Sequence, residues 1–361
     1  MKKASVQIKE LSLDELSSDL SEAALKVRAL RKNPFADSGK TLGRIAGFCD
    51  GREIGGEYVF PLLLRTPHGE FSVLGGSTLH VDPAYRRTGF GMDLPELRWQ
   101  KSHSKIALGA ALSQMALPVH QLLDYIVYLL PRNIMLWRSR VLVEMRLKGG
   151  LAKVVSFVVD TGIWIYSVLL RVASKIALHG YRIDDVKVTD EKILEDVAAL
   201  IAEDAARYSE VHDVRWLKWH MTESFSDDGP ARMVVVRKRG NVVGFYMIKK
   251  RFHEQASHRG FKNVWLGSVI EWQMKDGYKK KLGWLLVHAA LKLKKEGMDA
   301  VEVPSADSLL QRFFRRLGWR QVGESNFVIK AGEGSSLFRD ADMAKIGNWR
   351  LRPAMGDSGL S

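Results

Sequence analysis

The sequence has almost no residues that could cross-link the chain covalently. Among its 361 residues there is one cysteine, Cys49, and there are only ten prolines. A single cysteine cannot form an internal disulfide bond, which favours a reducing compartment and argues against a thiolate-ligated metal site. We therefore expect a cytoplasmic protein without a metal centre. Its oligomeric state cannot be read from the sequence.

The sequence also lacks an uninterrupted apolar run and an apolar segment behind its N-terminal lysines, so we expect no integral membrane span and no signal peptide. The most apolar stretch is "KVVSFVVDTGIWIYSVLLRVASK", which four residues interrupt: Ser156, Asp160, Thr161 and Gly162. We expect a linker helix over residues 151–180, buried against both of its neighbouring domains. The basic residues at its flanks (Lys153, Arg171 and Lys175) keep a contact with a membrane surface as the alternative.

What is abundant is positive charge. The chain carries 55 Lys and Arg against 41 Asp and Glu, a formal net charge of +14. This excess suggests an anionic partner, although charge alone does not decide fold, and we do not expect nucleic acid as the main partner. A composition of 46% hydrophobic and 27% charged residues is typical of a soluble globular protein, and this length favours two domains.

Hydrophobic periodicity predicts the same order of elements twice along the chain. The order is helix, hairpin, strand, helix, strand, helix, strand, beginning near residue 13 and again near residue 181. Asp50-Gly51 and Gly240-Asn241 supply the hairpin turns. In the first repeat a helix follows residue 91, with Pro95 expected in its first turn. We assign residues 1–150 and 181–331 to the two domains and 332–361 to a polar, loosely held tail.

The loop "VDPAYRRTGFGM", residues 81–92, combines arginines with glycines between a predicted strand and a predicted helix. A helix N-terminus offers amides without intrahelical partners and a positive dipole end, which together favour an anion. Gly89 and Gly91 would let a bulky phosphate approach the main chain, and Arg86 and Arg87 would add charge. The simpler alternative is a tight connection with solvated arginines.

The string "V-x-P-x-Y-R-x-x-G-x-G-x-x-L" resembles the acetyl-CoA loop of the GNAT superfamily of N-acetyltransferases. The resemblance implies an α/β (α+β) fold of two tandem GNAT-like domains, each with a mixed, mostly antiparallel sheet flanked by helices. It also implies that acetyl-CoA is a co-substrate and that the first domain transfers its acetyl group directly to an amine acceptor. The residues expected at the pyrophosphate and pantetheine are Val81, Arg86, Arg87, Thr88, Gly89, Phe90 and Gly91.

The corresponding stretch of the second half, "DGYKKKLGWLL", departs from that pattern. Lys281 stands roughly where the first glycine belongs, and its side chain would fill the space of a pyrophosphate. We therefore expect a degenerate second domain that shapes the acceptor site or braces the first. Phosphate binding by the charge of Lys279–Lys281 alone is the weaker alternative, and a solvated helix start is the commonest meaning of such a run.

The resemblance also implies that a tyrosine, from a string "Y-x-x-L-G-F", protonates the departing thiolate. His120 stands at the tyrosine's position in "HQLLDYIVY", and Phe314 in "FRRLGW". Histidine could donate a proton near neutral pH, so His120 is the catalytic candidate, with a merely packed helix histidine as the alternative. We do not select Glu57 as a base, and the tryptophan-rich segment around Trp216 is given no chemistry.

Three functions follow from these observations. The first is an acyl-CoA-dependent N-acyltransferase of a bacterial cytoplasm. The second, motivated by the missing tyrosines, is a CoA-binding protein that regulates or interacts without catalysis. The third is a basic protein that binds an anionic surface, either nucleic acid or membrane.

Overall fold

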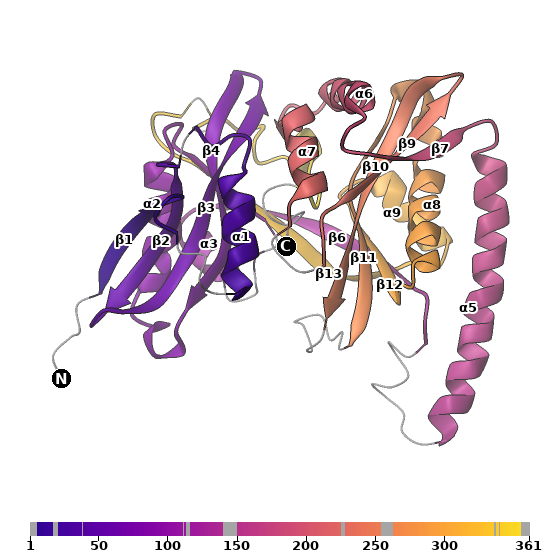
Figure 1. The fold of residues 1–361 in the computed structure, drawn as a ribbon, viewed down its shortest axis with the longest axis horizontal. Coiled ribbons are helices and arrows are strands. Elements are labelled where there is room, and N and C mark those ends of the chain that lie inside the picture. Colours follow the sequence, from indigo (N-terminus) through magenta and orange to yellow (C-terminus); the bar gives the residue numbers. More distant parts are fainter. Residues whose placement is uncertain are drawn as a thin grey trace. The chain divides into compact units, whose positions relative to one another are not determined.

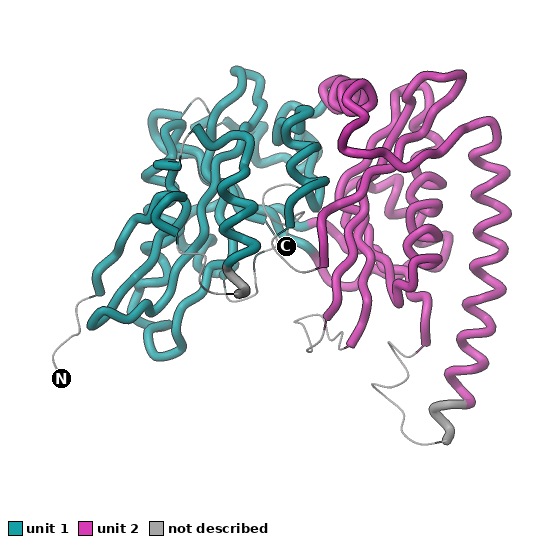
Figure 2. Tube along the Cα trace, in the orientation of Figure 1, with its two compact units in different colours: residues 1–129, 204–227, 325–361 teal, residues 130–203, 228–324 magenta. Residues whose placement is uncertain are grey.

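The computed structural model describes residues 6–16, 21–37, 39–110, 112, 116–139, 150–224, 228–253, 263–335, 337–338 and 340–354. The chain divides into two compact units (Figure 2). Unit 1 holds residues 1–129, 204–227 and 325–361, and unit 2 holds residues 130–203 and 228–324. Both units are discontinuous in sequence and so differ from the contiguous ranges expected above.

The sheet of unit 1 is mixed and mostly antiparallel, as expected. Its strands lie in the order β1-β2-β3-β4-β5-β13, with β8 paired to β3. Among the described strands of unit 1, β4 and β5 are the pair that runs in parallel. The strands are β1 (Gln7–Ser12), β2 (Leu42–Cys49), β3 (Arg52–Thr66), β4 (Gly69–Val81), β5 (Ile106–Ala110), β8 (Ser209–Glu210) and β13 (Arg320–Ala331).

The hairpin of β2 and β3 turns at Asp50 and Gly51, both with positive φ (51° and 80°), which confirms the turn expected from this dipeptide. Unit 1 also contains α1 (Ser21–Arg31), η1 (Pro83–Tyr85), α2 (Phe90–Lys101), α3 (Ala116–Leu122), α7 (Val214–Thr222) and η3 (Ile346–Asn348). The expectation for Pro95 is wrong: α2 begins at Phe90, so Pro95 lies beyond the first turn.

Unit 2 has a sheet of the same kind, with the order β6-β12-β11-β10-β9-β7, and among its described strands β11 and β12 pair in parallel (Figure 1). Its strands are β6 (Ile126–Leu136), β7 (Arg182–Val186), β9 (Arg232–Lys238), β10 (Asn241–His253), β11 (Val264–Met274) and β12 (Ala300–Pro304). Its helices are α5 (Gly150–Ala177), α6 (Glu191–Ala202), η2 (Asp276–Lys281), α8 (Leu282–Lys295) and α9 (Ser308–Arg316). The large core of this unit lies around α8 and β11.

The last strand of each repeat completes the sheet of the other unit. Residues 132–136 of β6, which follows α3 in the chain, pair with β12 in unit 2. Residues 327–331 of β13, which follows α9, pair with β5 in unit 1. Neither half of the chain therefore contains all the strands of one sheet.

The C-terminal segment is not a loosely held tail as far as residue 354. Trp349 is 6% exposed and stacks on Tyr208 with 4.8 Å between ring centroids. The amide of Arg350 donates to the carbonyl of Tyr208 over 3.0 Å, and the hydroxyl of Tyr128 donates to the carbonyl of Met343. These buried aromatic contacts hold the segment on unit 1.

Helix α5 also differs from expectation, because it is not buried on all sides. One face, with Ser167, Leu170 and Ser174 buried, packs on α8. The opposite face is exposed, with Phe157 at 73% and Trp164 at 64%. By length and composition the segment Val154–Ala177 would suffice to cross a membrane, and only 11% of its most apolar window is buried.

Candidate functional site

The loop between β4 and α2 is broken by a glycine in the left-handed conformation. β4 ends at Val81, η1 covers residues 83–85, and α2 begins at Phe90. Gly89 occupies the N-cap position with φ +91° and ψ −21°, and no side chain caps the helix there. This backbone is strained for any residue with a Cβ, so Gly89 is required by the conformation and not by crowding.

The break leaves main-chain amides at the start of α2 directed toward the loop. The amide of Met92 donates to the carbonyl of Gly89 over 2.8 Å, and that of Phe90 reaches the hydroxyl of Thr88 only at 3.5 Å. Among the described residues none accepts a hydrogen bond from the amide of Gly91. Open amides at a helix N-terminus are what an anionic ligand uses.

The expected cofactor residues divide into exposed and structural ones. Arg87, Thr88 and Gly89 are exposed, and within the described chain no ion pair engages Arg87. Arg86 is also exposed, but its Nε donates to the carbonyl of Val81 over 3.0 Å, so it ties the loop to the end of β4.

Phe90 serves the core instead of the loop surface. Its side chain is 3% exposed and packs with Ile45 and Leu94. Its ring fills the space above Gly47, where a Cβ would overlap it. Only the backbone of Phe90 is therefore available to a ligand.

Strands β4 and β5 diverge beside this loop. Their parallel pairing covers Leu74–Gly76 and ends at Gly76 opposite Gly109. Within the part of the chain that the structure describes, β4 then continues to Val81 paired only with β3, across an irregularity that includes Thr78 at φ 55°. A bulge of this kind re-aims a strand and ends its pairing, so among the described residues no strand on the β5 side pairs with the main-chain groups of β4 beyond Gly76.

A buried polar cluster lies at the point of divergence. Arg98 of α2 is 0% exposed, and its Nη1 forms an ion pair with Glu57 of β3, which is 1% exposed. The other terminal nitrogen of Arg98 lies 3.3 Å from Nε2 of His120 and 3.4 Å from the hydroxyl of Tyr125. A Cβ on Gly76 would overlap the guanidinium, so this glycine makes room for the cluster.

His120 is therefore neutral and fully buried, which argues against the proton-donor role expected for it. Burial, followed by the charge of Arg98, lowers the pKa of His120 to about 4. Its Nδ1 lies 2.9 Å from the carbonyl of Ala116 and donates to it, which leaves Nε2 as an acceptor for Arg98. Burial also raises the pKa of Tyr125 to about 12, and its hydroxyl donates to the carbonyl of Pro95 over 2.9 Å.

The matching positions at the ends of α3 and α9 are structurally equivalent. The amide of Tyr125 donates to the carbonyl of His120, and that of Trp319 to the carbonyl of Phe314, both over 3.0 Å. Asp124 and Gly318 precede these aromatic residues with φ of 59° and 71°. His120 and Phe314 thus occupy the same place in the two repeats, and both are buried.

The corresponding loop of unit 2 has no such break. There η2 runs directly into α8, and the amide of Leu282 donates to the carbonyl of Lys279. Lys281 has φ −93°, an ordinary right-handed conformation. The first turn of α8 therefore continues a helix, whereas the first turn of α2 begins after an opening.

Sequence reasoning missed Arg98, and it considered Glu57 without selecting it. The signal for Arg98 was an arginine four residues after Leu94, on the apolar side of α2.

The tryptophan-rich segment serves packing, because Trp216 is 0% exposed and stacks on His212 with 3.6 Å between ring centroids. Across the described ranges no group of three or more His, Cys, Asp or Glu residues is arranged to hold a metal ion.

Comparisons with known proteins find the fold but no sequence relative. No protein-family model and no curated protein sequence matches the chain. N-myristoyltransferase of Saccharomyces cerevisiae with bound myristoyl-CoA is similar over 92% of this chain and 80% of its own, with a TM-score of 0.58 at 13% identity. A GCN5-related N-acetyltransferase from Anabaena variabilis is similar over 91% and 73%, with a TM-score of 0.55 at 9% identity. With these structures and the mixed sheets described above, the chain has the fold of the GNAT superfamily.

Proposed function

We propose that the protein is an acyl-CoA-dependent N-acyltransferase that binds its donor, acetyl-CoA, in unit 1 and transfers the acyl group directly to an amine. The left-handed break at Gly89 carries this proposal, because it opens the N-terminus of α2 in unit 1 while the loop of unit 2 stays closed. The amides at the start of α2 and the side chain of Arg87 hold the pyrophosphate. A cytoplasmic location belongs to the same proposal.

The diverging strands supply the place for the thioester. Main-chain groups of β4 beyond Gly76 hydrogen-bond the pantetheine arm, as an added strand would. The amine nitrogen attacks the thioester carbonyl, the carbon–sulfur bond breaks, CoA leaves as a thiolate, and the amine loses its proton to water. The guanidinium of Arg98 lies against the last paired residues of β4 and β5 and favours the developing thiolate by its charge. His120 and Glu57 act as positioning residues, since both hold Arg98.

Calorimetric titration of acetyl-CoA tests the site directly. We expect about one site per chain in the wild type and loss of binding in Gly89→Glu, whose side chain adds negative charge to a strained backbone at the phosphate position. Gly277→Glu is the matched control, since Gly277 lies in open space in the loop of unit 2, and it should bind as the wild type does. Equal binding by all three proteins would contradict the assignment to unit 1.

The donor chain length is tested in the same experiment. Myristoyl-CoA and acyl-CoAs of intermediate length are titrated beside acetyl-CoA, because one structure of the same fold contains myristoyl-CoA. Tighter binding of a long-chain donor would replace acetyl by that acyl group and leave the rest of the proposal intact.

A CoA-binding protein without catalysis is the second candidate. It is favoured by the two helix-end positions, where His120 is held neutral and Phe314 has no proton to give. Release of free CoA thiol is measured with purified protein on a panel of amines. Amine-dependent thiol release that disappears in Gly89→Glu would eliminate this candidate, and binding without any turnover would favour it.

A further inference from the structure

Helix α5 carries an exposed apolar stripe along most of its length. Ten large apolar side chains on it are at least 36% exposed, and all of them except Val159 form this stripe: Val154, Phe157, Val158, Trp164, Ile165, Val168, Leu169, Val172 and Ile176. They recur at three- and four-residue spacing, so they lie on one face of the helix. At 1.5 Å per residue the stripe is about 34 Å long. Contiguous apolar surface of this extent marks an interaction site.

The opposite face of α5 is fixed to unit 2. Leu170 belongs to the large core with residues of α8, and the hydroxyl of Tyr166 donates to the carbonyl of Leu317. Asp160 accepts a hydrogen bond from the amide of Ser139 over 2.7 Å. A spanning orientation would place Asp160 and Arg171 within hydrocarbon and strip α5 from α8, so an orientation in the plane of an interface fits these contacts.

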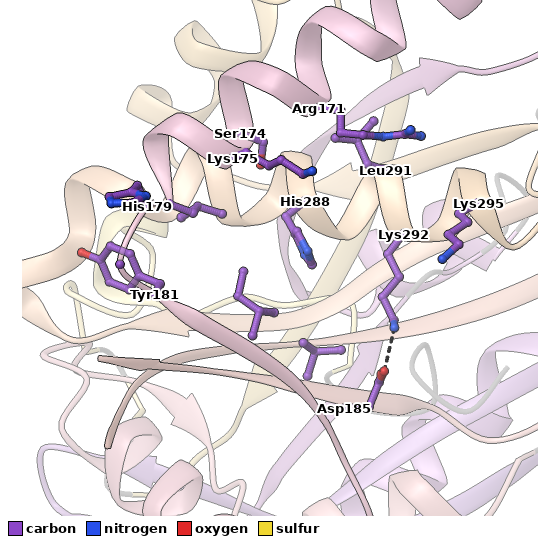
Figure 3. Close-up of a pocket in the computed structure, with 14 residues that line it drawn as sticks. Arg171, Ser174, Lys175, His179, Tyr181, Asp185, His288, Leu291, Lys292 and Lys295 are labelled. Carbon is purple, nitrogen blue, oxygen red and sulfur yellow. Dashed lines mark hydrogen bonds and ion pairs between the residues drawn. The ribbon is translucent and has the colours of Figure 1, made fainter. Parts of the chain in front are cut away.

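Beside the C-terminal half of the stripe lies a basic pocket of about 960 Å³. Arg171 and Lys175 of α5 line it, together with Lys292 and Lys295 of α8 (Figure 3). Lys292 is paired with Asp185 over 2.8 Å. The other three cations form no ion pair with any residue that the structure describes.

The pocket and the stripe adjoin one another. Arg171 and Lys175 each follow a stripe residue, Val168 and Val172, by three positions, which makes them neighbours on the helix surface. Apolar side chains flanked by unpaired cations match the boundary between acyl chains and anionic headgroups. A second copy of this chain fits less well, because it would bring the same cations and the same net charge of +14 to the contact.

We propose that α5 docks unit 2 on the surface of an anionic lipid bilayer. The helix lies in the plane of the interface with its apolar stripe among the acyl chains, and the basic pocket receives lipid phosphate groups. This proposal does not rest on the acyltransferase activity or on the loop at Gly89.

Co-sedimentation of the full chain with vesicles tests the docking. Vesicles of phosphatidylcholine alone are compared with vesicles containing 30% phosphatidylglycerol, at low and high salt. We expect binding to the anionic vesicles that weakens as salt rises. The stripe variant Phe157→Ser/Trp164→Ser/Leu169→Ser should lose binding to the anionic vesicles. Its control is Leu122→Ser/Leu309→Ser, which removes similarly exposed apolar groups on α3 and α9 and should bind normally.

A second variant isolates the charges. Arg171→Gln/Lys175→Gln/Lys295→Gln should lose about five-fold in partitioning to anionic vesicles per charge, about 100-fold in all. The control Lys187→Gln/Lys192→Gln/Lys280→Gln removes three exposed cations elsewhere in unit 2 and should change partitioning less than three-fold. Circular dichroism and thermal melting verify that the variants remain folded.

Three outcomes would overturn the proposal. They are no sedimentation of the wild type with anionic vesicles, undiminished sedimentation of the stripe variant, and equal losses in the charge variant and its control. A dimer without vesicles that the stripe variant converts to a monomer, with no vesicle binding, would assign the stripe to a second copy instead.

Discussion

Replacing Gly76 by alanine should disrupt the buried cluster at the divergence of β4 and β5. The added methyl group would overlap Nη1 of Arg98 and Oε1 of Glu57. The guanidinium has no room to retreat, since Arg98 is 0% exposed and its other terminal nitrogen already contacts His120 and Tyr125. The substitution therefore separates the ion pair while both charges stay buried.

The expected cost follows from the burial of the pair. Breaking a buried ion pair so that one charge remains uncompensated costs about 3–5 kcal/mol. For a domain of this size each kcal/mol lowers the melting temperature by about 2–4 °C. We expect the unit 1 transition in scanning calorimetry to fall by roughly 6–20 °C. Gly277→Ala is the control, because a Cβ there meets nothing within 4 Å, and it should melt within about 2 °C of the wild type.

A double-mutant cycle separates this mechanism from general crowding. In an Arg98→Ala background the guanidinium is gone, so Gly76→Ala should cost much less than in the wild type, with a coupling energy of about 2–3 kcal/mol. Acetyl-CoA affinity should fall with Gly76→Ala, since the cluster lies where the proposed thioester site begins. Unchanged melting of Gly76→Ala, or strictly additive costs in the cycle, would refute the reasoning.

Two further predictions concern the assembly of the units and the buried histidine. A fragment of residues 1–150 lacks β13, the partner of β5, and also Trp349 and its segment. It should therefore show no cooperative thermal transition. Native-like melting of the fragment would contradict the role of β13 in completing the sheet of unit 1. His120 has a pKa of about 4 when folded and of 6.5 in the unfolded chain, so the unfolded chain binds more protons between these values and the stability falls as the pH is lowered through them. Between pH 7 and pH 5, His120 should lower the free energy of unfolding by about 2 kcal/mol. Urea unfolding at the two pH values should show that His120→Gln loses less free energy of unfolding between pH 7 and pH 5 than the wild type does. Part of the loss should persist in this variant, because burial also lowers the pKa of His288 to about 4. A loss equal to that of the wild type would contradict the burial of His120.

Much of the fold and of the conformation of the loop before α2 could be read from local sequence. The Asp50-Gly51 turn, the strand before Val81 and the helix after Gly89 depend on conformational preferences of neighbouring residues, and the structure has all three. The repeated order of elements was predictable for the same reason, whereas the mixed sheets were expected from the family resemblance. In unit 2, Lys281 replaces the first glycine of the loop motif, and there the structure accordingly has a helix start without a left-handed break.

The remaining features depend on contacts between distant segments, which no local pattern encodes. The sequence by itself determined which segments become strands and helices and where glycine allows the left-handed break before α2, because glycine conformation and hydrophobic periodicity act over a few residues. Only the tertiary structure decided that β6 completes the sheet of unit 2, that β13 completes the sheet of unit 1, and that Trp349 packs on Tyr208. It also turned His120 from a candidate acid into a neutral partner of Arg98, since desolvation depends on what surrounds a side chain in space. The exposed face of α5 was decided in the same way, because an apolar helix is buried only where another element covers it.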